Sequence, residues 1–139
     1  MLERLKQAIS ENDNQEPPDL SNWWALISGL EKLVPGTMLF PKWKGYVKKA
    51  ARIHFFREVC SNPEIESTKD VGSGALWEIH CWLNDEEDGI EHCQQVTDWY
   101  AENAQEIYDY VPVVKKAKLE SDKARRARKK APQDIEPPF

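Results

Sequence analysis

Apolar positions recur every three or four residues along most of this chain, which is the spacing of one face of an α-helix. Residues 1–12 show the pattern, and the polar, proline-containing stretch 13–18 ends it. A second helix is predicted to begin after Asp19 or Ser21, either of which can cap free backbone amides, and to end at Pro35-Gly36. The apolar sides of the two helices are Leu2, Leu5, Ala8 and Ile9, and Trp24, Ile27, Leu30, Leu33 and Val34.

The stretch 41–60 predicts a central helix with two different sides. It carries six Lys or Arg residues and no acidic residue before Glu58. One side is apolar at helical spacing, and the other has a row of cations four residues apart that ends beside Phe55. The apolar positions are Trp43, Tyr46, Val47, Ala50, Ile53 and Phe56, and the cations are Lys44, Lys48 and Arg52.

Two segments after the central helix are harder to interpret. Residues 64–74 are polar and glycine-containing, so we expect a mobile surface loop. The run 75–83 does not alternate cleanly between polar and apolar positions, and a lone strand would lack a partner. We therefore predict a helix there, with Leu76, Ile79, His80 and Leu83 in one row.

The clearest helical period predicts the longest helix at residues 86–109. It opens on acidic residues, which complement the positive end of a helix, and we expect Pro112 to end or kink it. Its predicted buried row is Ile90, Cys93, Val96, Tyr100, Ala104 and Ile107.

The C-terminal part has a different composition. Residues 113–131 are strong helix formers without an apolar stripe, so a helix there would be marginal unless it docks. Residues 132–139 contain three prolines and are expected to be extended. The chain is thus predicted to be all-α, with a compact bundle of about five helices in residues 1–112 and a basic arm and tail in 113–139.

Charge is strongly segregated behind a net value of −5. Residues 41–57 carry six basic and no acidic residues, and residues 61–110 carry thirteen acidic residues against Lys69. Residues 115–130 carry nine basic residues against Glu120 and Asp122. Such blocks either neutralise one another and face solvent, or they bind a charged partner.

Location and redox state follow from the same composition. The sequence has no apolar run long enough for a membrane span, and its start is too polar for a secretory signal, so we expect a cytoplasmic protein. The three cysteines, Cys60, Cys81 and Cys93, contain no CxxC pair and are expected to be reduced.

The two basic segments are candidate nucleic-acid sites. Cations can neutralise phosphates, and aromatic rings can stack on the bases of a single strand. The alternative for the first segment is that its aromatic residues belong to the core and its lysines form a solvated face. For the second segment the alternatives are a contact with the acidic helix of the same chain or of another subunit, or no partner. The candidate binding residues are Lys42, Trp43, Lys44, Lys48, Lys49, Arg52, Phe55, Lys123, Arg125, Arg126, Arg128, Lys129 and Lys130, with Tyr46 as a further stacking candidate.

The last seven residues, QDIEPPF, resemble the acidic, Pro-Phe-terminated tip of bacterial single-stranded DNA-binding proteins. The upstream segment is basic where that family has a neutral linker. In that family the terminal Phe and its carboxylate dock in a basic, apolar pocket of replication and repair proteins. The resemblance implies a partner-binding role for Asp134, Ile135, Glu136, Pro138 and Phe139.

Metal binding and catalysis have weaker support. His80-Cys81 and His92-Cys93 offer zinc-ligand chemistry, but adjacent residues on a helix diverge by about 100°. The sequence lacks a phosphate-binding glycine loop, GxSxG and HExxH. The acidic cluster at 85–88 with Glu91 could hold magnesium, but acids at a helix start are more often caps. We expect no metal, no cofactor and no enzymatic activity.

The leading interpretation is a small accessory protein that binds nucleic acid, preferably single-stranded, through residues 42–57 and 115–130, and that recruits replication or repair proteins by its tail. Small size and mixed charge blocks also suit proteins of phages and mobile elements. The alternative is a protein-binding adaptor or inhibitor whose acidic surface mimics nucleic acid. Its working residues would be Asp85 to Asp88, Glu91, Asp98, Glu102, Glu106 and Asp109. Exposed aromatic residues are equally typical of a dimer interface, so an oligomer stays open.

Overall fold

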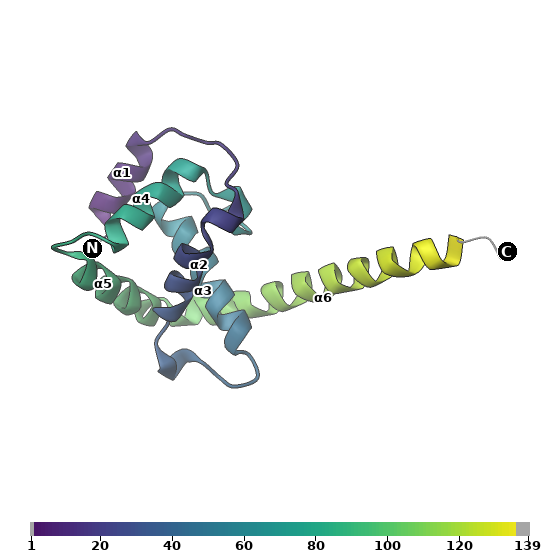
Figure 1. The fold of residues 1–139 in the computed structure, drawn as a ribbon. Coiled ribbons are helices and arrows are strands. Elements are labelled where there is room, and N and C mark those ends of the chain that lie inside the picture. The colour runs from purple at the N-terminus through teal and green to yellow at the C-terminus, as the bar shows by residue number, and fades with distance from the viewer. Residues whose placement is uncertain (1, 136–139) are drawn as a thin grey trace.

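The structure is a computed structural model that describes the backbone of residues 2–135 and the side chains of residues 2–127. Its described residues form six α-helices and three short 3-10 segments, which confirms the predicted all-α class (Figure 1). The α-helices are α1 (Glu3–Glu11), α2 (Trp24–Lys32), α3 (Lys44–Val59), α4 (Ser73–Leu83), α5 (Gly89–Glu102) and α6 (Ala104–Ile135). The 3-10 segments are η1 (Leu20–Asn22), η2 (Gly36–Met38) and η3 (Thr68–Asp70).

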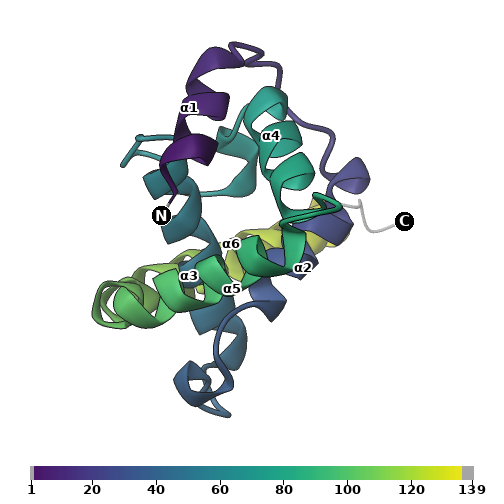
Figure 2. The same cartoon turned by 90° about the vertical axis from the view of Figure 1, so that its left-hand side faces the viewer.

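Helix α3 lies at the centre of the body and packs against α6, α2 and α1. In both views it crosses α6 (Figure 2). Because it has neighbours on several sides, its burial is not confined to one stripe, and seven of its residues are buried. Phe55 is one of them, with its ring 5.8 Å from the ring of Trp99 and 6.2 Å from that of Tyr100, both on α5. These aromatic side chains form the middle of the core.

Three residues assigned to apolar rows are exposed. Trp24 was expected on the buried side of α2, Ile90 on that of α5 and Trp43 on the apolar side of α3, yet all three side chains are exposed. Trp24 and Ile90 stand in the first turn of their helices, and Trp43 directly precedes α3. Periodicity identifies the apolar row of a helix but not how far along that row its neighbours extend.

Residues 64–74 are packed, and the prediction of a mobile surface loop is wrong. Ile65, Thr68 and Val71 are buried. Ser67 and Asp70 form a reciprocal capping box around η3. The backbone N–H of Gly74 donates to the carbonyl of Asn14 at 3.1 Å, an approach that requires glycine because an added Cβ at Gly74 would lie 2.9 Å from that oxygen.

The predicted single helix at 86–109 is two helices. The chain turns at Asn103, whose side-chain amide donates to the carbonyl of Trp99 at 2.8 Å and so satisfies the end of α5. Asp85 precedes the start of α5, and its carboxylate accepts from the amides of Glu87 and Asp88 at 3.2 and 2.8 Å. These contacts define both ends of α5. The helical period of the sequence continues past Asn103, so periodicity alone predicted one helix where there are two.

Helix α6 continues through both of its prolines. Pro112 was expected to end or kink a helix, but the helix runs on because Ile107, Val111 and Val114 pack on the body on either side of it. A proline inside a helix removes one backbone hydrogen bond and crowds the carbonyl four residues earlier, and this packing compensates for that cost. The helix also passes Pro132 and reaches Ile135, so the prediction of an extended chain is wrong for residues 132–135. Residues 136–139 lie outside the described part.

The second half of α6 projects from the body. Its first part packs on α3, and beyond Val114 its described side chains are exposed, apart from the partly covered Asp122 (Figure 1). The predicted boundary between residues 112 and 113 falls within this continuous helix. None of the described helices combines the length and the apolar character that a membrane crossing requires.

Candidate nucleic-acid interface

The two basic segments meet in the structure. Lys115 of α6 places its Nζ 5.8 Å from the ring centroid of Trp43, and Lys118 places its Nζ 5.8 Å from that of Tyr46. Trp43 and Tyr46 lie at the start of α3, so the first exposed turn of the arm lies against the first turns of the central helix. Cations at this distance from an aromatic face are held by its negative quadrupole.

The lysines of this region lie in the link before α3, at the start of α3 and in the first exposed turns of α6. Within the described part of the chain, no carboxylate oxygen lies within 4 Å of their amines. Burial, Arg52 and Lys118 lower the pKa of Lys49, in that order of effect. An anion bound here would relieve the repulsion among these cations. We define the basic-aromatic face as Phe40, Lys42, Trp43, Lys44, Tyr46, Lys48, Lys49, Lys115, Lys116 and Lys118.

Two predicted binding residues belong to the fold instead. Phe55 has 0% exposed surface and cannot stack on a base. The Arg52 side chain is 11% exposed and its Nη1 donates to Glu31 Oε1 on α2 at 3.2 Å, so its charge is already paired. Both belong to the part of α3 that α2 and α5 cover.

Phe40 was missed by the sequence analysis. It is 54% exposed, stands before α3 and lines an open hollow of about 540 Å³ together with Pro41, Lys42 and the 45% exposed Trp43. The sequence analysis assigned no role to Phe40 because it belongs to no helical period. One feature of the sequence could have indicated its exposure: Phe40 is an aromatic residue directly before Pro41, in a link that has no apolar helical row.

The arm beyond Lys118 presents further exposed cations. Lys123, Arg125 and Arg126 are exposed, and Arg125 Nη2 donates to Asp122 Oδ1 on the same helix at 3.0 Å. None of these side chains contacts the acidic helix α5 of the same chain. Arg128, Lys129 and Lys130 lie in the helical backbone, and their side chains are outside the described part.

The predicted partner-binding tail is only partly described. Asp134 and Ile135 lie in the last turn of α6, whereas Glu136, Pro138 and Phe139 are outside the described residues. The acidic surface stands elsewhere, on the solvent side of α5, where Glu91 and Glu102 are exposed. Glu106 and Asp109, which were assigned to the same acidic surface, are exposed on α6, the helix that continues into the basic arm.

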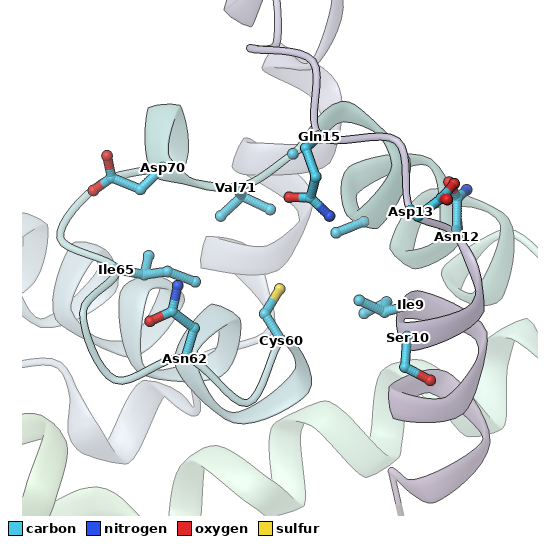
Figure 3. A pocket seen from close by; sticks show the side chains of 12 residues that line it. Ile9, Ser10, Asn12, Asp13, Gln15, Cys60, Asn62, Ile65, Asp70 and Val71 are labelled. Carbon is cyan, nitrogen blue, oxygen red and sulfur yellow. The ribbon is translucent and has the colours of Figure 1, made fainter.

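A second pocket gives weaker support for a functional site than the basic-aromatic face does. Figure 3 shows a polar pocket of about 230 Å³ between the C-terminal end of α3 and the segment after α1, with the Cys60 sulfur pointing into it. Burial raises the pKa of Cys60 to about 11, so its thiol is protonated at neutral pH. The Asp70 carboxylate at its edge is engaged by the amides of Glu66 and Ser67.

The two His-Cys pairs do not converge. His92 Nδ1 lies 2.6 Å from the carbonyl oxygen of Trp82, and His80 Nδ1 lies 3.3 Å from the amide of Asn84. Among the described residues, no group of three or more His, Cys, Asp or Glu side chains is arranged to hold a metal ion.

Comparisons with protein-family models, with curated proteins and with solved structures find no match for this chain.

Proposed function

We propose that this protein binds nucleic acid through the basic-aromatic face and the arm that continues from it. The observation that supports this most is the meeting of α3 and α6, which brings Lys115 and Lys118 onto the rings of Trp43 and Tyr46. Two segments that are separate in sequence become one surface of unpaired cations around aromatic rings. Phosphates and bases are the partner groups that match both components.

The energetics favour a polyanion over single carboxylates. Each lysine that neutralises a phosphate releases a condensed counterion, and this entropy gain adds up along the surface. From Lys115 to Arg126 the helix rises about 16 Å, and successive phosphates of one strand of B-DNA are spaced about 3.4 Å along the duplex axis, so the arm spans the axial length of about five of them. A folded protein partner rarely presents charge that densely.

The test is fluorescence anisotropy of labelled oligonucleotides over a salt series with the full chain. Lys44→Glu with Lys118→Glu changes the basic-aromatic face, and Lys123→Glu with Arg126→Glu changes the arm. We expect both to weaken binding, and to flatten the plot of log K against log salt by about 0.7 for each lost contact to a single strand. Arg4→Glu with Lys69→Glu is the control, because it makes the same charge change outside both regions.

Charge reversal also tests the acidic-surface alternative. If the acidic side of α5 binds a protein partner, reversing Lys44 and Lys118 leaves that binding intact, whereas reversing Glu91 and Glu102 abolishes it. Arg52 is unsuitable for this test because its ion pair with Glu31 belongs to the fold. Absence of binding by the unchanged protein, even at low salt, would rule out the proposed function.

A further inference from the structure

We infer that the hollow formed by Phe40, Pro41, Lys42 and Trp43 binds unpaired bases, which makes the proposed ligand a single strand of DNA or RNA. This inference rests on the proposed function and adds the class of nucleic acid. The hollow is open to solvent and measures about 540 Å³. It is built from two aromatic rings, one proline and one cation, on four consecutive residues.

Both aromatic side chains keep exposed surface that a base could contact. Phe40 is 54% exposed and Trp43 is 45% exposed, although both are large apolar side chains that folding normally covers. An exposed apolar surface of this kind, next to unpaired lysines, matches a ligand that is flat and apolar on its faces and anionic along its edge. A nucleotide strand has this combination, because each base offers a π face beside a phosphate.

The platform is held in place before a ligand arrives. The ring of Tyr108 on α6 lies 5.7 Å from the ring of Phe40, and its hydroxyl donates to the carbonyl of Met38 at 3.1 Å. The Trp43 amide closes a turn onto the carbonyl of Phe40 at 2.9 Å. A rigid aromatic platform loses little conformational entropy on binding, which favours affinity.

The surrounding cations set where the phosphates lie. Lys42 lines the hollow itself, and Lys115 stands over the ring of Trp43. A strand whose base rests in the hollow therefore has its backbone beside α6, from which the arm continues. Base and phosphate contacts are then made by adjacent parts of one surface.

A duplex cannot use the hollow in this way. Its bases are paired and stacked on one another, so their faces are covered, and unstacking costs a few kcal/mol per step. Double-stranded nucleic acid would meet only the cations. The hollow thus predicts a preference for single strands that charge alone does not explain.

The test compares single-stranded, double-stranded and abasic oligonucleotides of equal phosphate number with the full chain, using oligothymidylate and oligouridylate as the single strands. Phe40→Ala with Trp43→Ala should weaken single-strand binding about 5- to 150-fold for each stacked base, with an unchanged salt slope. Duplex binding should stay as it was. Trp77→Ala is the matched control, since Trp77 is 55% exposed on α4, away from the face.

The abasic strand tests the inference without altering the protein. The unchanged chain should bind it as weakly as the double variant binds the normal strand, and the variant should show no further loss on it. Phe40→Leu with Trp43→Leu keeps an apolar surface without the aromatic faces and should resemble the alanine pair. Equal thermal unfolding midpoints by circular dichroism show that each variant is folded.

Three outcomes would overturn the inference that the hollow binds unpaired bases. Equal loss for single and double strands, or no loss, overturns the base-binding hollow, while the lysine variants still report on the proposed function. Full binding of the abasic strand by the unchanged chain overturns it as well. If no oligonucleotide binds the unchanged protein, the proposed function fails, and this inference fails with it.

Discussion

The two ends of α3 carry the same kinds of residue and use them differently. At its start, Lys44 and Lys48 have no carboxylate within 4 Å among the described residues, and Trp43 and Tyr46 meet Lys115 and Lys118 of α6. Toward its end, Arg52 is paired with Glu31, and Arg57 donates through Nε to the carbonyl of Ile65 at 2.6 Å and through Nη2 to the Tyr110 hydroxyl at 3.1 Å. One end supplies free cations, and the other supplies cations that hold neighbouring segments together.

This difference teaches that position in the fold, and not residue type, decides what a cation does. Lys48 and Arg52 are consecutive members of one i, i+4 row, and their environments diverge because α2 brings Glu31 to only one of them. A partly buried guanidinium must be paired, since desolvation otherwise disfavours its charge. A lysine at the edge of the body has no such requirement and stays available for a ligand.

The largest expected effect separates the two aromatic residues that were both assigned to base stacking. Phe55→Ala should lower the free energy of unfolding by about 3–5 kcal/mol, because it leaves a cavity in the core. Trp43→Ala should lower it by less than about 1 kcal/mol, because that ring is largely at the surface. Urea unfolding followed by circular dichroism measures both. Equal costs would show that the two ends of α3 are not distinct in packing.

Sequence reasoning established the helices far better than their mutual arrangement. The row of α1 and the helical state of α4 followed from periodicity, because an amphipathic helix must bury its apolar side. Helix α3 has neighbours on several sides and also buries Phe55, which lies outside its predicted row. The meeting of Lys115 with Trp43 could not follow, since it depends on how α6 crosses α3. The hollow beside Phe40 was hidden for a similar reason, because it lies in a link without a period.

A second prediction concerns the arginine at the end of α3. Arg57→Ala removes two hydrogen bonds and a guanidinium that stands 4.5 Å from the ring centroid of Tyr110. We expect a loss of about 2–3 kcal/mol in the free energy of unfolding, since hydrogen bonds to charged groups contribute about 1.5–3 kcal/mol each and this side chain is partly exposed. Nucleic-acid affinity of the folded fraction should not change.

Lys44→Ala is the matched control for Arg57. It should alter the free energy of unfolding by no more than about 0.5 kcal/mol, as surface substitutions generally do, while weakening oligonucleotide binding. The contrast between the two ends would collapse if Lys44→Ala destabilised the protein as much as Arg57→Ala, or if Arg57→Ala reduced affinity as strongly as Lys44→Ala.

The smallest effect is a pH dependence at the structural end of α3. Burial and the nearby Arg57 lower the pKa of His54, and these outweigh the opposite influence of Glu106, 3.6 Å away, and of Glu58. The folded state therefore binds this proton less readily than the unfolded state, where the pKa is about 6.5. The stability associated with neutral His54 is complete above that pH and is lost as the pH falls toward the lowered pKa of the folded state.

Urea unfolding at a series of pH values, compared with His54→Leu, isolates this contribution, because leucine cannot titrate. The unchanged protein should lose stability more steeply than the variant as the pH falls below about 6.5. Parallel curves would mean that His54 has the same pKa in both states, and hence that Arg57 and burial do not act on it as the packed end of α3 requires. A steeper loss confirms that burial and Arg57 make protonation of His54 unfavourable at the packed end of α3, whereas the lysines at the start of α3 have no carboxylate within 4 Å among the described residues. That asymmetry is what leaves positive charge free for a ligand at one end of the helix only.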